Sequence, residues 1–188
     1  IPLVFREQNF DDLVCRKLGL ETKQPDMTAW KALVDRVIAP SRKVRIAVVG
    51  KYTDYVDSYK SVQESLIHGG IANDVGVEIA WTSSDLFTDQ EAAGTLLAGY
   101  DGLLVPGGFG VRGVEGMIEA VRWAREHNLP FFGICLGLQI AIIEFARNVC
   151  QLPDPNSTEF EPECGTPVVN LMQTQRDVSN LGGTMRLG

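Results

Sequence analysis

The amino-acid sequence predicts an α/β fold: a doubly wound, mostly parallel sheet preceded by a short helical linker. Short apolar segments alternate four times with segments of helical period between residues 41 and 149. These apolar segments contain few polar residues, as expected for strands that helices cover on both faces. The first 40 residues contain helical patterns but no such strand. We therefore expect an interdomain helical linker over residues 1–40 and an α/β domain over residues 41–188.

The composition is that of an ordinary globular chain. The 188 residues are 45% hydrophobic and 22% charged, which excludes a disordered or collagen-like polypeptide. The net charge of −7 argues against nucleic-acid or anionic-membrane partners, and no apolar run is long enough to span a membrane. The four cysteines form no C-x-x-C pair and the chain has two histidines. We therefore predict free thiols in a reducing, cytoplasmic compartment and no metal site.

Two helices are expected within the linker. Residues 10–18 have the pattern of a short amphipathic helix that ends at Gly19. Thr28 is expected to cap a second helix, which Pro40 ends. One face of this second helix collects the apolar residues Trp30, Leu33, Val34 and Val37.

The domain is expected to contain four strands with a helix after each. The strands are predicted over residues 44–49, 75–82, 103–105 and 130–134. The helices are predicted over residues 57–70, 88–99, 114–121 and 136–149. Gly69 and Gly70 are expected to close the first helix, Thr88 to cap the second, and the apolar last helix to be deeply buried. Beyond Val149 we expect a loop and one further strand over residues 168–172.

The strongest chemical signal is the G-x-C-x-G pattern of residues 133–137, where an expected strand passes directly into a helix. Glycines two residues before and after Cys135 let other backbone pass close, so that the turn lifts the thiol out of the sheet. The sulfur then lies at a helix N-terminus, where the dipole favours the thiolate. The N–H of Leu136 points to where an oxyanion would form. We predict that Cys135 is a nucleophile rather than a small buried side chain.

A glycine-rich loop, residues 106–116, follows the third expected strand. It matches neither a P-loop nor a G-x-G-x-x-G motif. Its backbone N–H groups are suited to supply a second oxyanion donor or to hold an anion. Because it lies one strand–helix unit before Cys135, we favour this role over a purely structural turn. Residues 50–52, Gly-Lys-Tyr, are interpreted as a turn with a candidate binding role at the same edge of the sheet.

A cysteine hydrolase needs a general base, and the sequence offers none that is convincing. The two histidines, His68 and His127, are both expected at helix C-termini, where the dipole favours a histidine. We predict that both are structural.

The cysteine motif, Gly133 to Gln139, resembles the nucleophile motif of class I glutamine amidotransferases. Other segments narrow the resemblance to the CTP synthase family and its flavodoxin-like glutaminase domain. These segments are the loop over residues 106–116, residues 49–52 with 58–61, residues 156–160 and residues 181–188. Residues 1–3 and 11–13 resemble the stretch that joins the family's synthetase domain to its glutaminase domain. The resemblance covers nearly the whole chain.

The resemblance implies a role for particular residues. In this family ATP phosphorylates the uracil ring of UTP, and ammonia from glutamine displaces the phosphate to give CTP. By resemblance, Cys135 would form a glutamyl thioester, and Gly108 and Leu136 would form the oxyanion hole. The residues that would bind glutamine are Gly108, Leu136, Gly137, Leu138, Gln139 and Glu159. Glu159 would pair with the α-ammonium, although without the resemblance it would be interpreted as a solvated loop residue beside Glu161 and Glu163.

The resemblance also implies what lies elsewhere in the polypeptide. Both ends of the sequence have the appearance of cuts, and the family's His-Pro-Glu motif would follow Gly188. We therefore expect the domain over residues 41–188 to be C-terminally incomplete and this chain to lack turnover. For the whole enzyme the resemblance implies ATP, Mg²⁺ and GTP as an allosteric activator, with no cofactor in this chain. It implies L-glutamine, the synthetase domain and a homotetramer as partners.

Two alternatives stay open at this point. The chain could be another amidotransferase or hydrolase with a cysteine elbow, which differs in substrate. It could instead be a non-catalytic regulatory module of the same fold. Labelling of Cys135 by a glutamine-analogue electrophile separates the substrate classes.

Overall fold

The computed structural model describes residues 1–21, 23–55 and 57–170. The chain divides into two compact units. The first contains residues 1–43 and 66–77, and the second contains residues 44–65 and 78 onward. The segment 181–188 that resembles CTP synthases lies outside the described residues.

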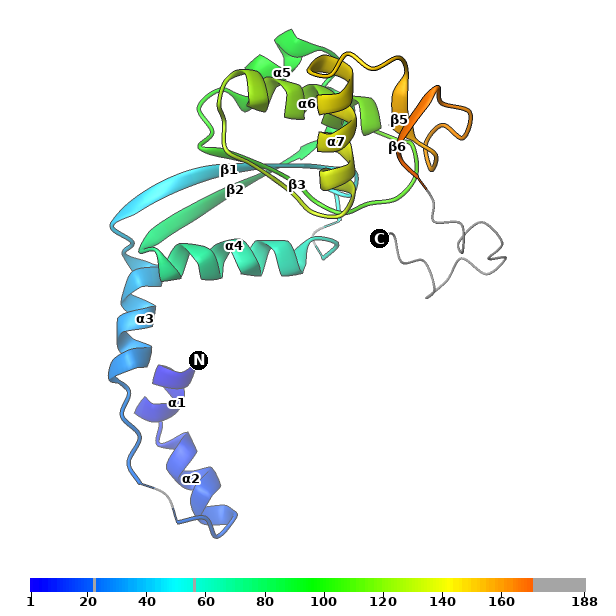
Figure 1. Cartoon of the computed structure of the whole chain (residues 1–188). Helices are drawn as coiled ribbons and strands as arrows, with labels where there is room; N and C mark the ends of the chain where they lie inside the picture. The colour runs from blue at the N-terminus through cyan, green and yellow to red at the C-terminus, as the bar shows by residue number, and fades with distance from the viewer. Residues whose placement is uncertain (22, 56, 171–188) are drawn as a thin grey trace. The chain divides into compact units, whose positions relative to one another are not determined.

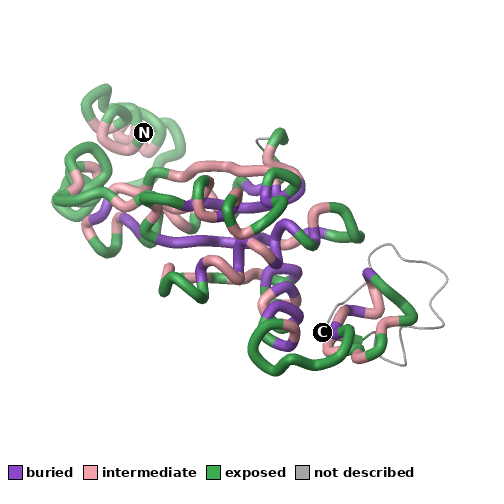
Figure 2. The backbone as a smooth tube through the Cα atoms, turned by 90° about the horizontal axis from the view of Figure 1, so that it is seen from above, coloured by how far each residue is buried: buried purple, intermediate pink, exposed green. Residues whose placement is uncertain are grey.

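Helices make up most of the first unit: α1 (Pro2–Glu7), α2 (Phe10–Lys17) and α3 (Thr28–Ile38) (Figure 1). The sequence pattern predicted α2 and α3 but missed α1, a short helix with proline in its first turn. The guanidinium of Arg6 in α1 bonds the carboxylates of Asp11 and Asp12 in α2, at 2.8 and 3.0 Å. None of the three helices contains a buried residue, as the green and pink N-terminal trace of Figure 2 shows.

The predicted cap of α3 was wrong. The helix begins at Thr28 after Met27, and Thr28 is not its cap residue. The carboxylate of Asp26 accepts hydrogen bonds from the N–H and the hydroxyl of Thr28, at 2.9 and 2.6 Å. A carboxylate at this point satisfies a free N–H of the first turn. The predicted apolar face of α3 is largely exposed, with Trp30 at 46% and Val37 at 51%.

A four-stranded sheet has the order β2-β1-β3-β4 (Figure 1). Its strands are β1 (Arg42–Gly50), β2 (Val75–Ser83), β3 (Gly102–Val105) and β4 (Phe131–Gly133). The pairs β1–β3 and β3–β4 are parallel. This order is that of the first four strands of a flavodoxin-like doubly wound sheet, so the predicted fold class is confirmed.

Each strand is followed by a helix. The helices are α4 (Lys60–Ala72), α5 (Gln90–Leu97), α6 (Val114–Glu126) and α7 (Leu136–Asn148), with a 3-10 helix, η1 (Ser84–Leu86), before α5. The predicted end of α4 at Gly69 and Gly70 was wrong, because the helix continues to Ala72. The predicted cap at Thr88 was also wrong: Asp89 caps α5 by accepting the N–H of Ala92 at 2.8 Å.

The main core lies between one face of the sheet and helices α5, α6 and α7. Alternate strand residues, Ala47, Val49, Leu103 and Val105, face this core, as the two-residue period of a strand requires. Buried backbone (purple) runs through this part of the chain in Figure 2. Helix α7 is less buried than predicted, since Leu138 is 57% and Phe145 50% exposed.

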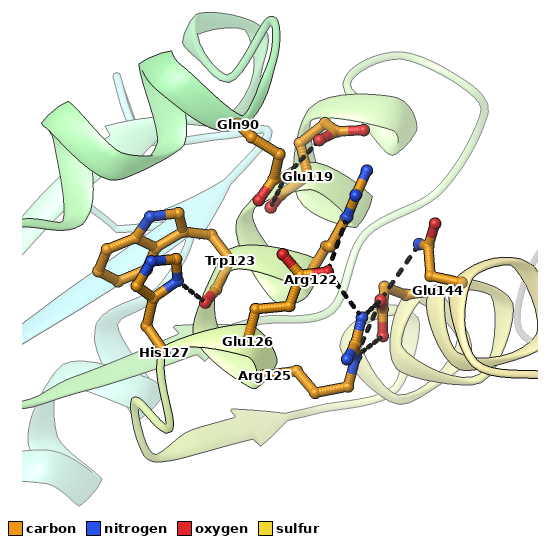
Figure 3. Close-up of polar contacts among 9 residues, drawn as sticks. Gln90, Glu119, Arg122, Trp123, Arg125, Glu126, His127 and Glu144 are labelled. Atoms are coloured by element: carbon orange, nitrogen blue, oxygen red, sulfur yellow. Dashed lines mark hydrogen bonds and ion pairs between the residues drawn. The ribbon is translucent and has the colours of Figure 1, made fainter.

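Helices α6 and α7 are held together by a buried ion pair, drawn in Figure 3. Glu144 of α7 is 2% exposed, and Arg125 of α6 donates to both of its carboxylate oxygens at 2.8–3.1 Å. Asn148 donates a further bond to Glu144 at 3.1 Å. Glu144 is therefore the main cause that raises the pKa of Arg125. Removing Arg125 alone would leave the buried carboxylate of Glu144 without its ion-pair partner, which is destabilising, whereas Arg125 is itself an exposed residue.

The segment after α7 contains two short strands rather than a loop and one strand. β5 (Pro155–Ser157) and β6 (Thr166–Val169) pair in parallel. Arg147 of α7 donates to the carbonyl of Pro155 at 3.2 Å, and Phe160 packs into the main core. The predicted strand over residues 168–172 overlaps β6, and its last two residues lie outside the described part.

Candidate functional site

Cys135 lies in a strained turn between β4 and α7. Its backbone has φ 52° and ψ −101°, a region that residues with a side chain rarely adopt. The N–H of Ile134 still bonds the carbonyl of Val105 at 2.9 Å, so the strand pairing extends to the residue before the turn. The Cys135 residue is exposed. The turn thus presents the thiol beyond the carboxyl end of the sheet.

The two glycines of the pattern are required by close backbone approaches. A Cβ at Gly133 would lie 2.5 Å from the carbonyl carbon of Gly137, on the first turn of α7. A Cβ at Gly137 would overlap the carbonyl oxygen of Val105 in β3. The helix therefore starts directly against the strands, and only glycine fits at either position.

The first turn of α7 supplies the backbone donors nearest to the thiol. The N–H groups of Leu138 and Gln139 bond the carbonyl of Cys135 at 3.1 and 3.2 Å. Leu136 is the first residue of the helix, a position whose N–H has no acceptor within the helix. The residue as a whole is only 1% exposed, and its side chain belongs to the main core. The side-chain oxygen of Gln139 is buried without a hydrogen-bond partner among the described residues.

The glycine-rich loop lies against the cysteine turn. A Cβ at Gly107 would be 3.6 Å from the Cβ of Cys135, and one at Gly108 would be 3.1 Å from a methyl carbon of Leu136. The structure thus brings together the residues that the sequence assigned to the nucleophile and the oxyanion hole. Both come from the carboxyl ends of neighbouring parallel strands, β3 and β4, where doubly wound folds bind ligands.

Two charged side chains hold the far part of this loop. The ammonium of Lys51, a residue that is 4% exposed, donates to the carbonyls of Phe109, at 3.1 Å, and Gly110. The carboxylate of Glu159 accepts the N–H of Gly110 at 3.2 Å. Burial lowers the pKa of Lys51, and the nearby Glu159 carboxylate partly offsets this effect.

Arg112 ties the same loop to two further segments. It donates to the carbonyl of Lys51 and forms an ion pair with Asp85 of η1 at 2.8 Å. The sequence pattern indicated no role for Arg112, and for Lys51 it indicated only a place in a turn with a candidate binding role. The available signal for Lys51 was a lysine directly after a buried strand, at the edge of the sheet where sites form.

The two histidines differ in their helical setting. His127 ends α6, as predicted, and its ring stacks on Trp123 at 4.2 Å between ring centroids. Its Nδ1 lies 2.9 Å from the carbonyl of Trp123 (Figure 3). His68 lies within α4, four residues before its end, rather than at the C-terminus, because α4 continues past the glycines. His127 therefore has the structural role that the sequence predicted.

The rest of the described chain offers no competing centre. Over residues 1–21, 23–55 and 57–170, no cluster of three or more His, Cys, Asp or Glu side chains could hold a metal ion. In the same ranges no helix has the length and apolar character to cross a bilayer. All four cysteines are free thiols.

Comparisons with known proteins show the family of this chain. The family model "Glutamine amidotransferase class-I" matches residues 54–188. The whole chain is 50% identical to CTP synthase of Geotalea uraniireducens and 52% identical to that of Ruminiclostridium cellulolyticum. It spans 35% of the length of each relative. A solved structure, "Trypanosoma brucei CTPS - glutaminase domain with bound acivicin", aligns with a TM-score of 0.66 and 45% identity, over 71% of this chain and 52% of that one.

Proposed function

This chain belongs to the class-I glutamine amidotransferase family, and we propose from this that it is part of the glutaminase portion of a CTP synthase, which hydrolyses L-glutamine in the whole enzyme. Cys135 attacks the carboxamide carbon and forms a glutamyl thioester, and ammonia leaves. In the whole enzyme this ammonia aminates UTP to CTP in a reaction driven by ATP. The similarity to CTP synthases over the whole chain supports this substrate class. The other cysteine-elbow enzymes and the non-catalytic module remain the alternatives for the test below.

The observation that carries the proposal is the strained turn at Cys135 beside Gly107 and Gly108. The chain holds Cys135 at φ 52°, a conformation that costs of order 1–3 kcal/mol. A buried structural cysteine would gain nothing from such strain. An exposed nucleophile gains a helix N-terminus on one side and backbone donors of a glycine loop on the other. We assign the oxyanion hole to the N–H groups of Gly108 and Leu136.

The remaining glutamine-binding residues follow the same assignment. Gly137, Leu138 and Gln139 belong to the first turn of α7, directly after Cys135, and the buried side-chain oxygen of Gln139 has no hydrogen-bond partner among the described residues. Glu159 supplies a carboxylate for the α-ammonium of glutamine. Its bond to the N–H of Gly110 supports this role, because it places the charge at the glycine loop.

Residues 1–40 serve in this proposal as the interdomain linker, and residues 41–188 belong to the glutaminase domain. The synthetase domain and a homotetramer are the proposed partners, and the compartment is the cytoplasm. ATP, Mg²⁺ and GTP act in the whole enzyme. We propose no cofactor for the part of the enzyme that this chain spans.

The first prediction tests the substrate class. Acivicin is expected to label Cys135 alone among the four cysteines, and a saturating excess of L-glutamine is expected to slow labelling about tenfold or more, because both occupy one site. D-Glutamine and L-asparagine should not protect. Peptide mass spectrometry identifies the labelled residue and follows the rate.

Ammonia release is measured on the same samples. We expect no steady release, because a cysteine hydrolase needs a general base and His127 is held against Trp123 by its ring and its Nδ1. Protection by L-asparagine or by no amide would favour another cysteine-elbow hydrolase. Failure of acivicin to label Cys135 would favour the non-catalytic module.

The second prediction concerns Glu159. Glu159→Gln keeps an oxygen that can accept the N–H of Gly110 but removes the charge. We expect the concentration of L-glutamine that gives half-maximal protection to rise roughly tenfold or more, because a hydrogen bond to a charged partner is lost. The control is Glu161→Gln, which alters an exposed carboxylate two residues away. Equal protection in both variants would remove Glu159 from the glutamine site.

A further inference from the structure

We propose that Lys51 is a positioning residue that sets the oxyanion hole by fixing the glycine-rich loop. This inference rests on the proposed function, since Lys51 would act at the same site through the loop rather than by contact with the substrate. Lys51 follows β1, whereas the loop follows β3 and the nucleophile follows β4. The three carboxyl ends of neighbouring strands thus each contribute one part of the site.

The aliphatic stem and the ammonium of Lys51 contact different parts of the loop. Its Cδ lies 3.5 Å from the position of a Cβ at Gly108, so the aliphatic stem borders the proposed oxyanion glycine. Its ammonium passes that glycine and donates to the carbonyls of Phe109 and Gly110. The peptide planes that join Phe109 to Gly110 and Gly110 to Val111, one residue beyond Gly108, are therefore held by one buried group.

The loop needs such a restraint. It contains five glycines within residues 107–116, and each glycine leaves its backbone free to adopt alternative conformations. Gly110 is already at φ 75°. Without the ammonium, the peptide planes around Gly108 could rotate and turn its N–H away from the thiol. A preorganised donor stabilises the oxyanion without a cost of reorientation, and a loop that must reorient at the moment of reaction loses this stabilisation.

The surroundings explain why a lysine is kept there despite its burial. The carboxylate of Glu159 also bonds this loop, by accepting the N–H of Gly110 at 3.2 Å. The ring of Phe160 lies 5.9 Å from the ammonium. Arg112 fixes the backbone of Lys51 itself and is anchored on Asp85. A buried ammonium with these partners is a fixed part of the structure rather than a solvated charge.

The test uses two reagents that differ in their need for an oxyanion hole. With L-glutamate γ-semialdehyde, the sulfur of Cys135 bonds to the aldehyde carbon. The C=O π electrons move to oxygen, which receives the thiol proton, so the hemithioacetal carries its oxygen where the oxyanion forms. Alkylation by iodoacetamide displaces iodide and forms no such oxygen. The aldehyde affinity is read as protection of Cys135 against iodoacetamide.

For Lys51→Met in the 188-residue chain, we expect the dissociation constant of the aldehyde to rise roughly 10- to 100-fold, below or near the effect of losing one oxyanion donor outright. The iodoacetamide rate should stay within about twofold of the unsubstituted chain, since the thiol and its turn are unchanged. Lys31→Met, which removes an exposed lysine of α3, should leave both values unchanged.

Each other outcome decides the matter. Equal aldehyde affinity in Lys51→Met and the unsubstituted chain would overturn the positioning role and leave the proposed function standing. Failure of the unsubstituted chain to bind the aldehyde would overturn the proposed function and the positioning role with it. If Lys51→Met does not fold, Lys51→Leu decides in its place: it keeps an aliphatic stem and no donor, and an unchanged affinity there would equally overturn the role.

Discussion

Cys135→Ala is expected to abolish covalent labelling by acivicin and hemithioacetal formation, a loss of at least about 10³-fold in rate. The reason is that the other three cysteines, at positions 15, 150 and 164, have no comparable setting. Each is a free thiol, but Cys135 alone stands at a strand-to-helix turn flanked by glycines. Intact-mass spectrometry over a time course measures the rate in both proteins.

The fold of Cys135→Ala should be retained. The residue is exposed, so alanine creates no cavity, and the strained φ is neither relieved nor worsened by a side chain that also carries a Cβ. We therefore expect the variant to bind L-glutamine non-covalently, with a dissociation constant within a few-fold of the unsubstituted chain, by isothermal titration calorimetry. Binding of glutamine without covalent labelling would distinguish the role of Cys135 as nucleophile from a role in binding the substrate.

The matched control is Cys150→Ala, which removes another exposed thiol at the end of α7. It should label at the rate of the unsubstituted chain. Glutamine-sensitive labelling that persists in Cys135→Ala and disappears in Cys150→Ala would move the nucleophile and refute the assignment of the turn.

The sheet and the cysteine turn were predictable because their causes are local. The buried segments of the two central strands, residues 47–50 of β1 and 102–105 of β3, are apolar because other elements cover them, and this pattern is visible without knowledge of the neighbours. The G-x-C-x-G spacing likewise encodes a steric requirement, which the structure shows as the approaches of Gly133 to Gly137 and of Gly137 to Val105. The steric requirements of this tight turn are therefore recognisable in the sequence as a pattern of five residues.

The features that the sequence did not reveal depend on partners distant in the chain. Gly70 was interpreted as a helix end, but a Cβ there would overlap the carbonyl of Val75, so the glycine serves packing within a continuous helix. β5 and β6 are too short to show a period of two. Lys51 was interpreted as part of a turn with a candidate binding role, and its contacts could not be predicted because its acceptors lie 58 and 59 positions away. Such roles become visible only once the strands are placed side by side.

The helix caps are a further feature that the sequence did not fully reveal. Thr28 and Thr88 were chosen as caps, whereas the aspartates Asp26 and Asp89 bond the first-turn N–H groups. Asp and Thr both accept such bonds, so composition does not rank adjacent candidates. Backbone conformation decides: Asp89 is extended, with φ −163° and ψ −178°, which aims its carboxylate back at the helix.

Gly137→Ala is expected to destabilise the chain by about 3 kcal/mol or more, or to prevent folding. The added Cβ would overlap the carbonyl oxygen of Val105 and lie 3.0 Å from its carbonyl carbon. Val105 is fully buried in the middle of the parallel sheet, and its carbonyl also accepts the N–H of Ile134. Neither α7 nor β3 can move without disturbing the core, and overpacking of this kind is among the most costly of substitutions.

The measurement is thermal unfolding followed by circular dichroism, with an expected fall in Tm of about 6–12 °C, from 2–4 °C per kcal/mol for a chain of this size. Gly69→Ala is the matched control. It adds the same methyl group within α4, where nothing lies within 4 Å of the new Cβ, and it should stabilise the helix by about 0.5–1 kcal/mol. Acivicin labelling of Cys135 should fall in Gly137→Ala and not in Gly69→Ala, because displacement of α7 moves its first N–H groups away from the thiol. A Gly137→Ala protein with unchanged Tm and unchanged labelling would mean that α7 does not press on β3 as the structure places it, and that the glycine spacing around Cys135 has another cause.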